Sequence, residues 1–343
     1  MHPKRSDNLE SALAKAAGWL RDHQRTDGHL PSRTMVVESC YKGPLALLVA
    51  GHASSAHRLL AAIEPWIRSD GDILSPREEA AFHTTHYLYA HGYLTIGAWM
   101  MGRFDVAKKL YRFIKEQQAE LQGGFLSQGP AFAKTKTMDT VSTSISGWAA
   151  LVCGDIDAAV KAARFLETVF HRQPSPQSSF YSTTYLDGGF VSKGEIPGEE
   201  HPVIDVRDPE QDWYFIGLPT VFLSYLYRYS GDAKHLMLAE SYMGYLDDIC
   251  CEGAFLDFSS GKSGVGAALL YTLTRKERYR QIAVAVADFI LKWQSPSGVW
   301  QAEGVGLEES PADLLWGDMD MTTEYVLWLS LISGSLTEHS LSA

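Results

Sequence analysis

The feature that most constrains the fold of this chain is a helix, turn and helix unit that recurs along nearly its whole length. The turn carries a glycine followed by an apolar or aromatic residue at positions 24–30, 69–73, 122–125, 252–255 and 294–300. A further copy at 173–180 has lost its glycine. Self-similarity with a long period is typical of repeat architectures. The sequence therefore predicts six helical hairpins.

Two kinds of helix alternate within these units. The first of each pair has apolar residues on one face, and the second is apolar on nearly every side. First helices are predicted at 9–25, 54–68, 103–121, 155–171, 232–251 and 276–294. Second helices are predicted at 38–51, 83–101, 139–153, 211–230, 262–274 and 320–333. Because a helix without a polar face needs cover on all sides, we expect an inner ring inside an outer ring.

The predicted fold class is all-α, a single (α/α)6 toroid of six hairpins spanning residues 1–343. Each turn glycine is expected to close the end of a helix in the left-handed conformation, where a side chain is costly. The longest non-helical stretch, about 173–210, is expected to act as a lid over the central cavity, because loops of that length inside a compact domain are usually functional.

Composition excludes several classes of function. With 45% hydrophobic and 21% charged residues the chain is globular, and its net charge of -11 disfavours nucleic-acid partners. No apolar run is long enough to span a membrane, and the N-terminus lacks the features of a signal peptide. Four cysteines match neither a disulfide framework nor a zinc finger, and nucleotide-binding motifs are absent. We expect a cytoplasmic protein with a small-molecule substrate and without a cofactor or metal.

Polar residues open each apolar helix, and in a toroid these helix starts meet at one end of the cavity. The six clusters are 38–42, 83–87, 139–143, 211–214, 262–263 and 318–324. Each cluster alone is explained by helix capping, but six together favour a polar pocket. The predicted substrate-binding residues are Glu38, Tyr41, Lys42, Tyr87, Gln211, Trp213, Tyr214, Trp316 and Glu324. Their aromatic rings suit either a cation or a sugar.

Four further titratable residues are candidates for acid and base catalysis. Asp139 and Asp212 open neighbouring apolar helices and would form a carboxylate pair across the cavity, as glycoside hydrolysis requires, or would each cap a helix. His83 and His86 are three residues apart and would share a helix face. We interpret them as cavity-facing catalytic or structural histidines, since no third ligand motif accompanies them to form a metal site.

Two segments resemble motifs of terpenoid cyclases. Residues 289–300, with Gln294 and a Gly-x-Trp sequence, resemble the QW repeat of squalene-hopene cyclases. The sequence Asp318-Met319-Asp320-Met321-Thr322 resembles the DxDD-T motif of class II terpenoid cyclases, although Met321 stands where that motif has its last aspartate. The resemblance implies that Asp320 protonates an alkene or epoxide. The six-pair layout also resembles the toroids of protein prenyltransferase β subunits and of six-hairpin sugar enzymes.

These observations support three hypotheses. The first is a cofactor-independent cyclase or isomerase that acts by acid-base chemistry on a small, largely apolar substrate, with Asp320 as the acid. The candidates for adjusting the acidity of Asp320 or removing the final proton are Asp318, His83, His86 and Tyr214. The alternative is a carbohydrate-active enzyme, a glycoside hydrolase, lyase or epimerase that uses Asp139, Asp212 and a histidine. The third is a toroid that binds a ligand without catalysis.

Overall fold

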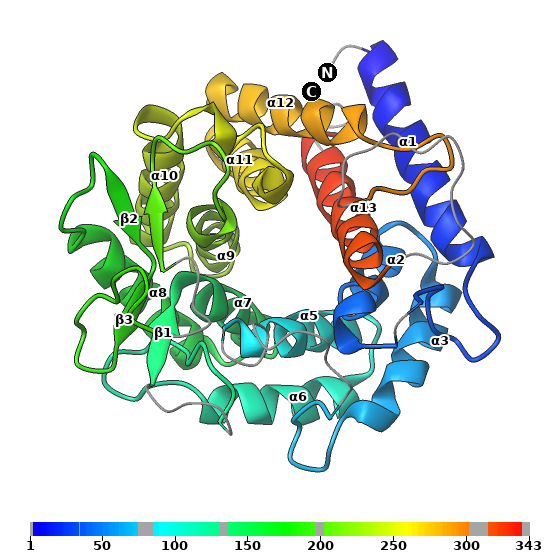
Figure 1. The fold of residues 1–343 in the computed structure, drawn as a ribbon, viewed down its shortest axis with the longest axis horizontal. Coiled ribbons are helices and arrows are strands. Elements are labelled where there is room, and N and C mark those ends of the chain that lie inside the picture. Colours follow the sequence, from blue (N-terminus) through cyan, green and yellow to red (C-terminus); the bar gives the residue numbers. More distant parts are fainter. Residues whose placement is uncertain are drawn as a thin grey trace.

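The computed structural model describes residues 3–33, 35–74, 85–130, 136–196, 202–301 and 315–337, and it forms two concentric rings of helices (Figure 1). The inner ring consists of α2 (Gly43–Val49), α5 (Tyr87–Met100), α7 (Thr140–Val152), α9 (Tyr214–Ser230), α11 (Gly261–Thr274) and α13 (Trp316–Thr337). The outer ring consists of α1 (Pro3–Asp22), α3 (Ala53–Ile63), α6 (Phe104–Glu116), α8 (Ile156–His171), α10 (Ala233–Asp248) and α12 (Glu277–Lys292). The predicted (α/α)6 toroid is confirmed.

The inner helices are buried because neighbours cover them on every side. In α5 every residue from Tyr87 to Ala98 is buried. Small residues let inner backbones touch: a Cβ added to Gly217 of α9 would lie 2.9 Å from the backbone nitrogen of Ser263 in α11. Contacts between α13 and α2 close the ring. Although these helices are apolar all round, no helix in the described ranges has the length and hydropathy needed to cross a bilayer.

The recurrent glycine turn follows an outer helix and packs against the next outer helix of the ring. Gly71 follows α3 and has φ 96°, and a Cβ on it would lie 2.1 Å from the carbonyl oxygen of Lys109 in α6. The prediction that each turn glycine ends a helix is wrong. The first outer helix, α1, ends at Asp22, well before its turn glycine Gly28. Glycine is needed because a positive φ coincides with close contact to the next outer helix. Gly253 is an exception, since its φ is not positive and its crowding comes from Pro209.

Glutamine side chains reinforce these turns. In three of them a glutamine amide donates one hydrogen bond within its own turn and another to the adjacent outer helix. The acceptor carbonyls are Gly28 and Ser55 for Gln24, Gly123 and Ala158 for Gln118, and Gly298 and Ala12 for Gln294. The bond from Gln294 to Ala12, at 2.9 Å, ties the last outer helix to the first. The repeat in the sequence therefore records the contacts that close the outer ring.

The predicted long non-helical segment, 173–210, contains short strands that the sequence analysis did not anticipate. They are β2 (Ser179–Tyr181), β3 (Thr183–Tyr185) and β4 (Val203–Asp205), while residues 197–201 lie outside the described part. β2 pairs antiparallel with β4, and β3 pairs with β1 (Thr137–Asp139), which leads directly into α7. This pairing anchors the segment beside the start of an inner helix.

The turn contacts can be tested with two glycines of positive φ. Gly71→Ala would place a methyl group against Lys109, whereas Gly102→Ala, at φ 75°, meets nothing within 4 Å. We expect Gly102→Ala to lower the free energy of unfolding by about 1–2 kcal/mol through backbone strain alone. Gly71→Ala should cost about 1–3 kcal/mol more because the helices must separate. Urea unfolding measures both, and equal losses would contradict the role of the contact.

Candidate functional site at the inner-helix starts

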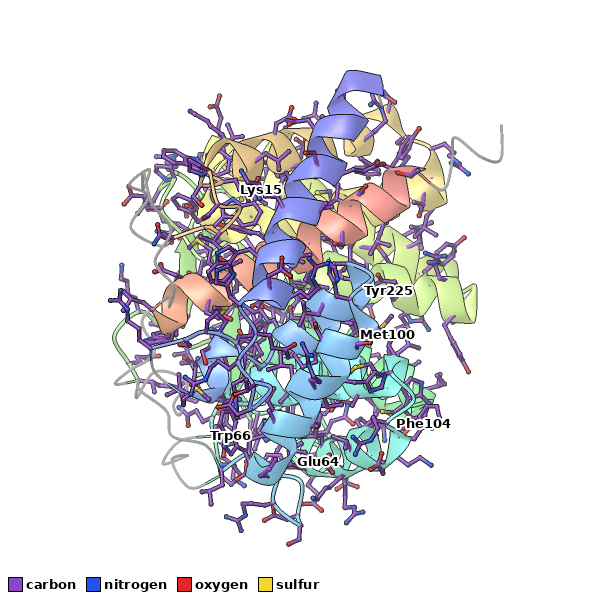
Figure 2. All side chains as sticks on the ribbon, turned by 90° about the vertical axis from the view of Figure 1, so that its right-hand side faces the viewer. Lys15, Glu64, Trp66, Met100, Phe104 and Tyr225 are labelled. Carbon is purple, nitrogen blue, oxygen red and sulfur yellow. The ribbon has the colours of Figure 1, made fainter. Side chains whose placement is uncertain are left out.

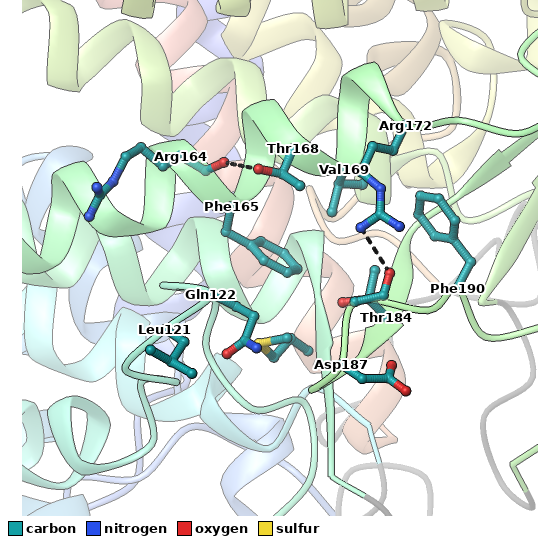
Figure 3. A pocket seen from close by; sticks show the side chains of 12 residues that line it. Leu121, Gln122, Arg164, Phe165, Thr168, Val169, Arg172, Thr184, Asp187 and Phe190 are labelled. Atoms are coloured by element: carbon teal, nitrogen blue, oxygen red, sulfur yellow. Dashed lines mark hydrogen bonds between the residues drawn. The ribbon is translucent and has the colours of Figure 1, made fainter.

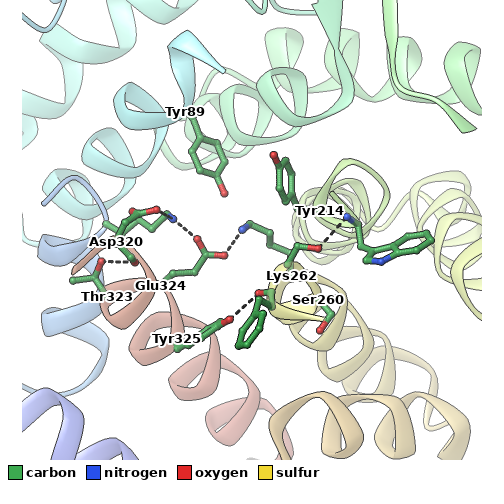
Figure 4. Close-up of polar contacts among 12 residues, drawn as sticks. Tyr89, Tyr214, Ser260, Lys262, Asp320, Thr323, Glu324 and Tyr325 are labelled. Carbon is green, nitrogen blue, oxygen red and sulfur yellow. Dashed lines mark hydrogen bonds and ion pairs between the residues drawn. The ribbon is translucent and has the colours of Figure 1, made fainter. Parts of the chain in front are cut away.

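Four charged side chains meet between the starts of three inner helices, and we call them the charge cluster (Figure 4). Nζ of Lys42, just before α2, lies 2.9 Å from Oδ2 of Asp320 and also contacts Glu324. The other oxygen of Glu324 pairs with Lys262, at the start of α11. Asp320 and Glu324 are one turn apart on α13. Two positive and two negative charges balance, which makes burial of the two lysines, at 2% and 3% exposure, tolerable.

The surroundings shift the pKa values of these four groups in different directions. Burial disfavours both ammonium groups, but Asp320 and Glu324 together raise the pKa of Lys42. For Lys262, burial and repulsion by Lys42 outweigh the attraction of Glu324, and its pKa is lowered. Burial and the neighbouring Glu324 raise the pKa of Asp320. Burial of Glu324 is outweighed by Lys262 and Lys42, which bring its pKa to about 2. One carboxyl therefore retains a proton more readily than the other.

Aromatic rings surround Lys262. Nζ of Lys262 lies 5.0 Å from the ring centroid of Tyr214, 5.6 Å from that of Trp328 and 5.8 Å from that of Tyr89. These distances fit cation-π contacts. Burial raises the pKa of Tyr214 well above its usual value, as do the charges of Asp212 and Glu324, so this phenol remains a hydrogen-bond donor at neutral pH.

Three buried polar atoms around the cluster have no hydrogen-bond partner among the described residues. They are Oδ1 of Asp320, the hydroxyl of Tyr41 and the indole nitrogen of Trp328. Native proteins rarely leave such atoms unsatisfied, because each costs free energy once it is removed from water. Their gathering at one place favours a site for a polar ligand.

A pocket of about 220 Å³ opens onto the charge cluster. Its lining residues are Tyr214, Phe258, Ser259, Lys262, Gly317, Asp320, Met321, Glu324 and Tyr325. The volume is below the range of about 300–1,000 Å³ that is typical of sites for drug-sized ligands. The pocket therefore suits one small molecule. Three of the residues singled out in the sequence line it, namely Tyr214, Asp320 and Glu324.

His86 lies beside this pocket in an unusual conformation. Its φ of 54° is in the left-handed region, which few residues other than glycine occupy. Its Nε2 lies 3.5 Å from the hydroxyl of Tyr214, and its ring packs on Phe215. The described helix begins at Tyr87, so the prediction that His86 lies on a helix is wrong, and His83 lies outside the described residues. Strain of this kind concentrates at functional sites.

The two other candidate aspartates have separate surroundings. Asp139 caps α7, since its carboxylate accepts hydrogen bonds from the backbone nitrogen of Ser142 at 2.6 Å and from its hydroxyl at 2.8 Å. The capping alternative is thus confirmed for this residue. Burial nevertheless raises the pKa of Asp139 to about 6, despite these hydrogen bonds. Asp212 precedes α9, where its charge acts on Tyr214.

Several predicted substrate-binding residues have contacts outside the pocket. The hydroxyl of Tyr87 donates to Asp72, 2.8 Å away, and its ring packs on Phe113 of the outer ring. Trp213 is fully buried and its indole donates to a backbone carbonyl 3.1 Å away, while the amide of Gln211 donates to a neighbouring carboxylate in its loop. Glu38 is buried in the turn before α2, and Trp316 and Asp318 lie in the first turn of α13. None of these residues lines the pocket.

Sequence reasoning gave no role to three residues at the centre of the site. Lys262 stood in a predicted polar cluster, and a lysine that opens an otherwise apolar helix was a usable signal. Tyr89 and Trp328 lie within apolar helices, where an aromatic residue is indistinguishable from core packing. Only the positions of the helices reveal that these rings face Lys262.

Two other cavities lie away from this site. One of about 370 Å³ is between α8 and the hairpin at β3, where Arg172 donates to the carbonyl of Gly188 and lies over Phe190 (Figure 3). Another, of about 410 Å³ and mostly apolar, is lined by residues of five inner helices. Met100 and Tyr225 are among these residues, and both are labelled in Figure 2. Arg164, Arg172 and Asp187 line the first cavity, but no ion pair among the described residues joins them, in contrast to the charge cluster.

Comparison with known proteins finds similarity in structure only. No protein-family model and no curated protein matches the sequence. A D-mannose isomerase is 14% identical with a TM-score of 0.67, covering 96% of this chain and 99% of its own. A family 76 glycoside hydrolase, an α-mannanase of Bacteroides thetaiotaomicron, is 10% identical with a TM-score of 0.65, covering 98% and 97%. An unsaturated glucuronyl hydrolase of Bacillus sp. GL1 is 12% identical with a TM-score of 0.59, covering 94% and 95%. These proteins share the toroid fold.

The cost of breaking the charge cluster is testable. Lys42→Met removes the cation that pairs with both carboxylates, and we expect the free energy of unfolding to fall by about 3–5 kcal/mol, as for other buried pairs that lose one partner. The control Lys276→Met removes an exposed lysine, 58% accessible, from its pair with Glu240. That change should cost no more than about 1 kcal/mol. Comparable losses in chemical denaturation would show that the cluster is not a coupled unit.

The buried carboxyl of Asp139, which caps α7, should make the stability of the protein depend on pH. Because the folded pKa of Asp139, about 6, exceeds its value of 3.8 when unfolded, the folded state binds the proton more tightly. The wild type should therefore lose stability relative to Asp139→Asn as pH rises from 4 to 7, by about 2.5 kcal/mol. Asp232, an exposed cap of α10, has a lowered pKa, so Asp232→Asn should show the opposite trend. Unfolding at a series of pH values distinguishes the two.

Proposed function

We propose that this protein is an isomerase or epimerase that moves a proton at the carbon next to a carbonyl group in a small, carbohydrate-like hydroxycarbonyl compound. The observation that carries the proposal is the pair Asp320 and Glu324, whose pKa values are displaced in opposite directions in one small pocket. Of two carboxyl groups whose pKa values differ in this way, one can act as the acid and the other as the base.

The groups of the pocket suit an anionic intermediate. The ionised Glu324 would accept a proton from carbon, while Asp320 or Tyr214 would donate a hydrogen bond or a proton to the carbonyl oxygen. The ammonium of Lys262 would stabilise the negative charge that develops on that oxygen. His86, next to Tyr214, would connect this phenol to the other side of the pocket.

The same charges disfavour a carbocation, which cyclase chemistry requires. Two buried ammonium groups lie next to the carboxyl that would act as the acid, and Asp320 accepts a hydrogen bond from Lys42 at 2.9 Å. A positive intermediate would be repelled at the point where it forms. We therefore favour the carbohydrate hypothesis of the sequence analysis over the cyclase hypothesis, and the D-mannose isomerase of similar fold supports that choice.

Glycoside hydrolysis is the second candidate, because hydrolases of similar fold exist and the site has two neighbouring carboxyl groups. Two observations favour proton transfer instead. The pocket is small for an oligosaccharide. The ammonium of Lys262 in its wall suits the negative charge of an enolate-like intermediate better than the positive charge that develops during glycoside cleavage. We also propose that the described parts of the predicted lid, residues 173–196 and 202–210, cover the pocket end of the ring, since β3 pairs with β1 just before α7.

Exchange of carbon-bound hydrogen tests the proposal. The chain is incubated in D2O with a panel of aldoses and ketoses, and deuterium uptake next to the carbonyl is followed by NMR. Glu324→Gln should lower the exchange rate by at least about 100-fold, the usual contribution of a catalytic base. Glu240→Gln, on the outer helix α10, should leave it unchanged.

Exchange by Glu324→Gln at the wild-type rate would overturn the assignment of the base. Release of reducing sugar from glycosides, with no deuterium uptake from any sugar of the panel, would establish the hydrolase instead. Melting curves of both variants exclude loss of folding as the cause.

A further inference from the structure

We infer that Lys262 is a nucleophile that forms an imine with the carbonyl carbon of the substrate. The inference deepens the proposed function by assigning it a covalent step. It rests on that function for the class of substrate, but the assignment of the reactive amine depends only on the geometry of the two lysines of the charge cluster.

The two lysines have unequal positions. Lys42 is held between both carboxylates and is not among the residues that line the pocket. Lys262 pairs with Glu324 alone, and it is part of the pocket wall. A small molecule that enters the pocket therefore meets the amine of Lys262 and not that of Lys42.

The electrostatic surroundings also distinguish the two amines, and they too favour Lys262 as the reactive one. Lys42 is held as a cation by two negative charges. That fixed cation repels a second charge on Lys262, which must also be desolvated, so the pKa of Lys262 is lowered. Desolvation and a neighbouring cation are the two means by which an amine becomes neutral, and hence nucleophilic, near physiological pH.

The step can be written with the groups that are present. In the reactive form one proton has moved from the ammonium of Lys262 to Asp320, so the net charge of the cluster is unchanged. The neutral amine of Lys262 attacks the carbonyl carbon, and the oxygen takes the proton of Asp320. Glu324 removes a proton from the new C–N nitrogen. The hydroxyl takes that proton from Glu324 and leaves as water, while the nitrogen lone pair forms the C=N bond and the nitrogen keeps its remaining proton. In total one amine, one carbonyl and the proton of Asp320 give one protonated imine and one water, and Glu324 is again ionised.

The imine restricts the type of reaction. It acidifies the neighbouring C–H bond, and Glu324 takes that proton to leave an enamine. Protonation of the same carbon from the opposite face, by the phenol of Tyr214, restores the imine with inverted configuration. Water then returns a proton to Tyr214 and takes the one held by Glu324, and one water releases the product. Return to the former carbonyl carbon would leave a secondary amine that water cannot cleave. Lys262 therefore points to epimerisation and not to interconversion of aldoses and ketoses.

The aromatic rings around Lys262 fit this role. The ring centroids of Tyr214, Trp328 and Tyr89 lie 5.0–5.8 Å from Nζ, so the rings restrict the position of the amine. The phenol of Tyr214, kept protonated by burial, can donate to the oxygen of the first adduct.

Residue-resolved reductive methylation tests the reactive amine without knowledge of the substrate. The intact chain is treated with formaldehyde and cyanoborohydride from pH 6 to 11, a range that includes the ordinary lysine pKa of about 10.4. The rate at each lysine is measured by peptide mass spectrometry. Lys193, an exposed lysine, serves as the internal reference. We expect the rate profile of Lys262 to reach half its maximum at least one pH unit below that of Lys193, and Lys42 to remain unmodified.

A profile of Lys262 that coincides with that of Lys193, or no modification of Lys262 at any pH, would overturn the inference. Modification of Lys42 in preference to Lys262 would overturn it as well. A rate profile shifted to lower pH at Lys262 alone supports the inference. Slow entry of the reagents into the pocket lowers the maximal rate but does not change the pH at half-maximum.

A second experiment separates this inference from the proposed function. Lys262→Arg keeps a cation beside Glu324 but removes the nucleophile, and its melting temperature reports folding. Loss of deuterium exchange by at least 100-fold in this variant, with a cyanoborohydride-trapped sugar adduct on Lys262 of the wild type, supports both proposals. Exchange that persists in Lys262→Arg overturns the imine and leaves the isomerase or epimerase function standing. A trapped adduct without exchange for any sugar overturns that function and leaves the nucleophile standing.

Discussion

The structure depends on the burial of six helices that have no polar face. Such helices are stable only where other helices surround them, and a closed inner ring inside an outer ring satisfies this for all six at once. Ring closure also requires close contact between neighbours, which small residues such as Gly217 permit. The consequence for function is geometric. All inner helices start at the same end, so polar residues from distant parts of the sequence meet there.

What gathers at that end is a balanced set of charges rather than a set of isolated acids. Removing Lys42 or Lys262 from water is tolerable because Asp320 and Glu324 compensate them. The arrangement is unequal, however, because one lysine has two partners and the other has one. That inequality separates the acidities of the carboxyl groups and of the amines. A symmetrical pair of ion pairs would stabilise the ring without offering a distinct acid, base or nucleophile.

The outer ring has a separate role. Its turns repeat because each one packs closely on the backbone of the next outer helix, as Gly71 does on Lys109. In addition, a glutamine amide hydrogen-bonds a turn to the next outer helix at three places. These contacts support the ring mechanically and contain no titratable groups that face the pocket. The QW-like segment around Gln294 belongs to this bracing, so its presence is explained by the architecture and carries no information about the substrate.

Periodicity alone determined the number of helices, their order and the division into two rings, since these follow from which faces of each helix are apolar. It also placed Asp320, Glu324, Tyr214 and Lys42 at helix starts that would converge. Only the tertiary structure decided which of these side chains share a pocket: Asp139 turns back to cap its own helix, Tyr87 faces the outer ring, and Lys262 enters the charge cluster. The physical reason is that the direction of a side chain and the acidity of a buried group depend on neighbours from other helices, and no pattern within a single helix contains them.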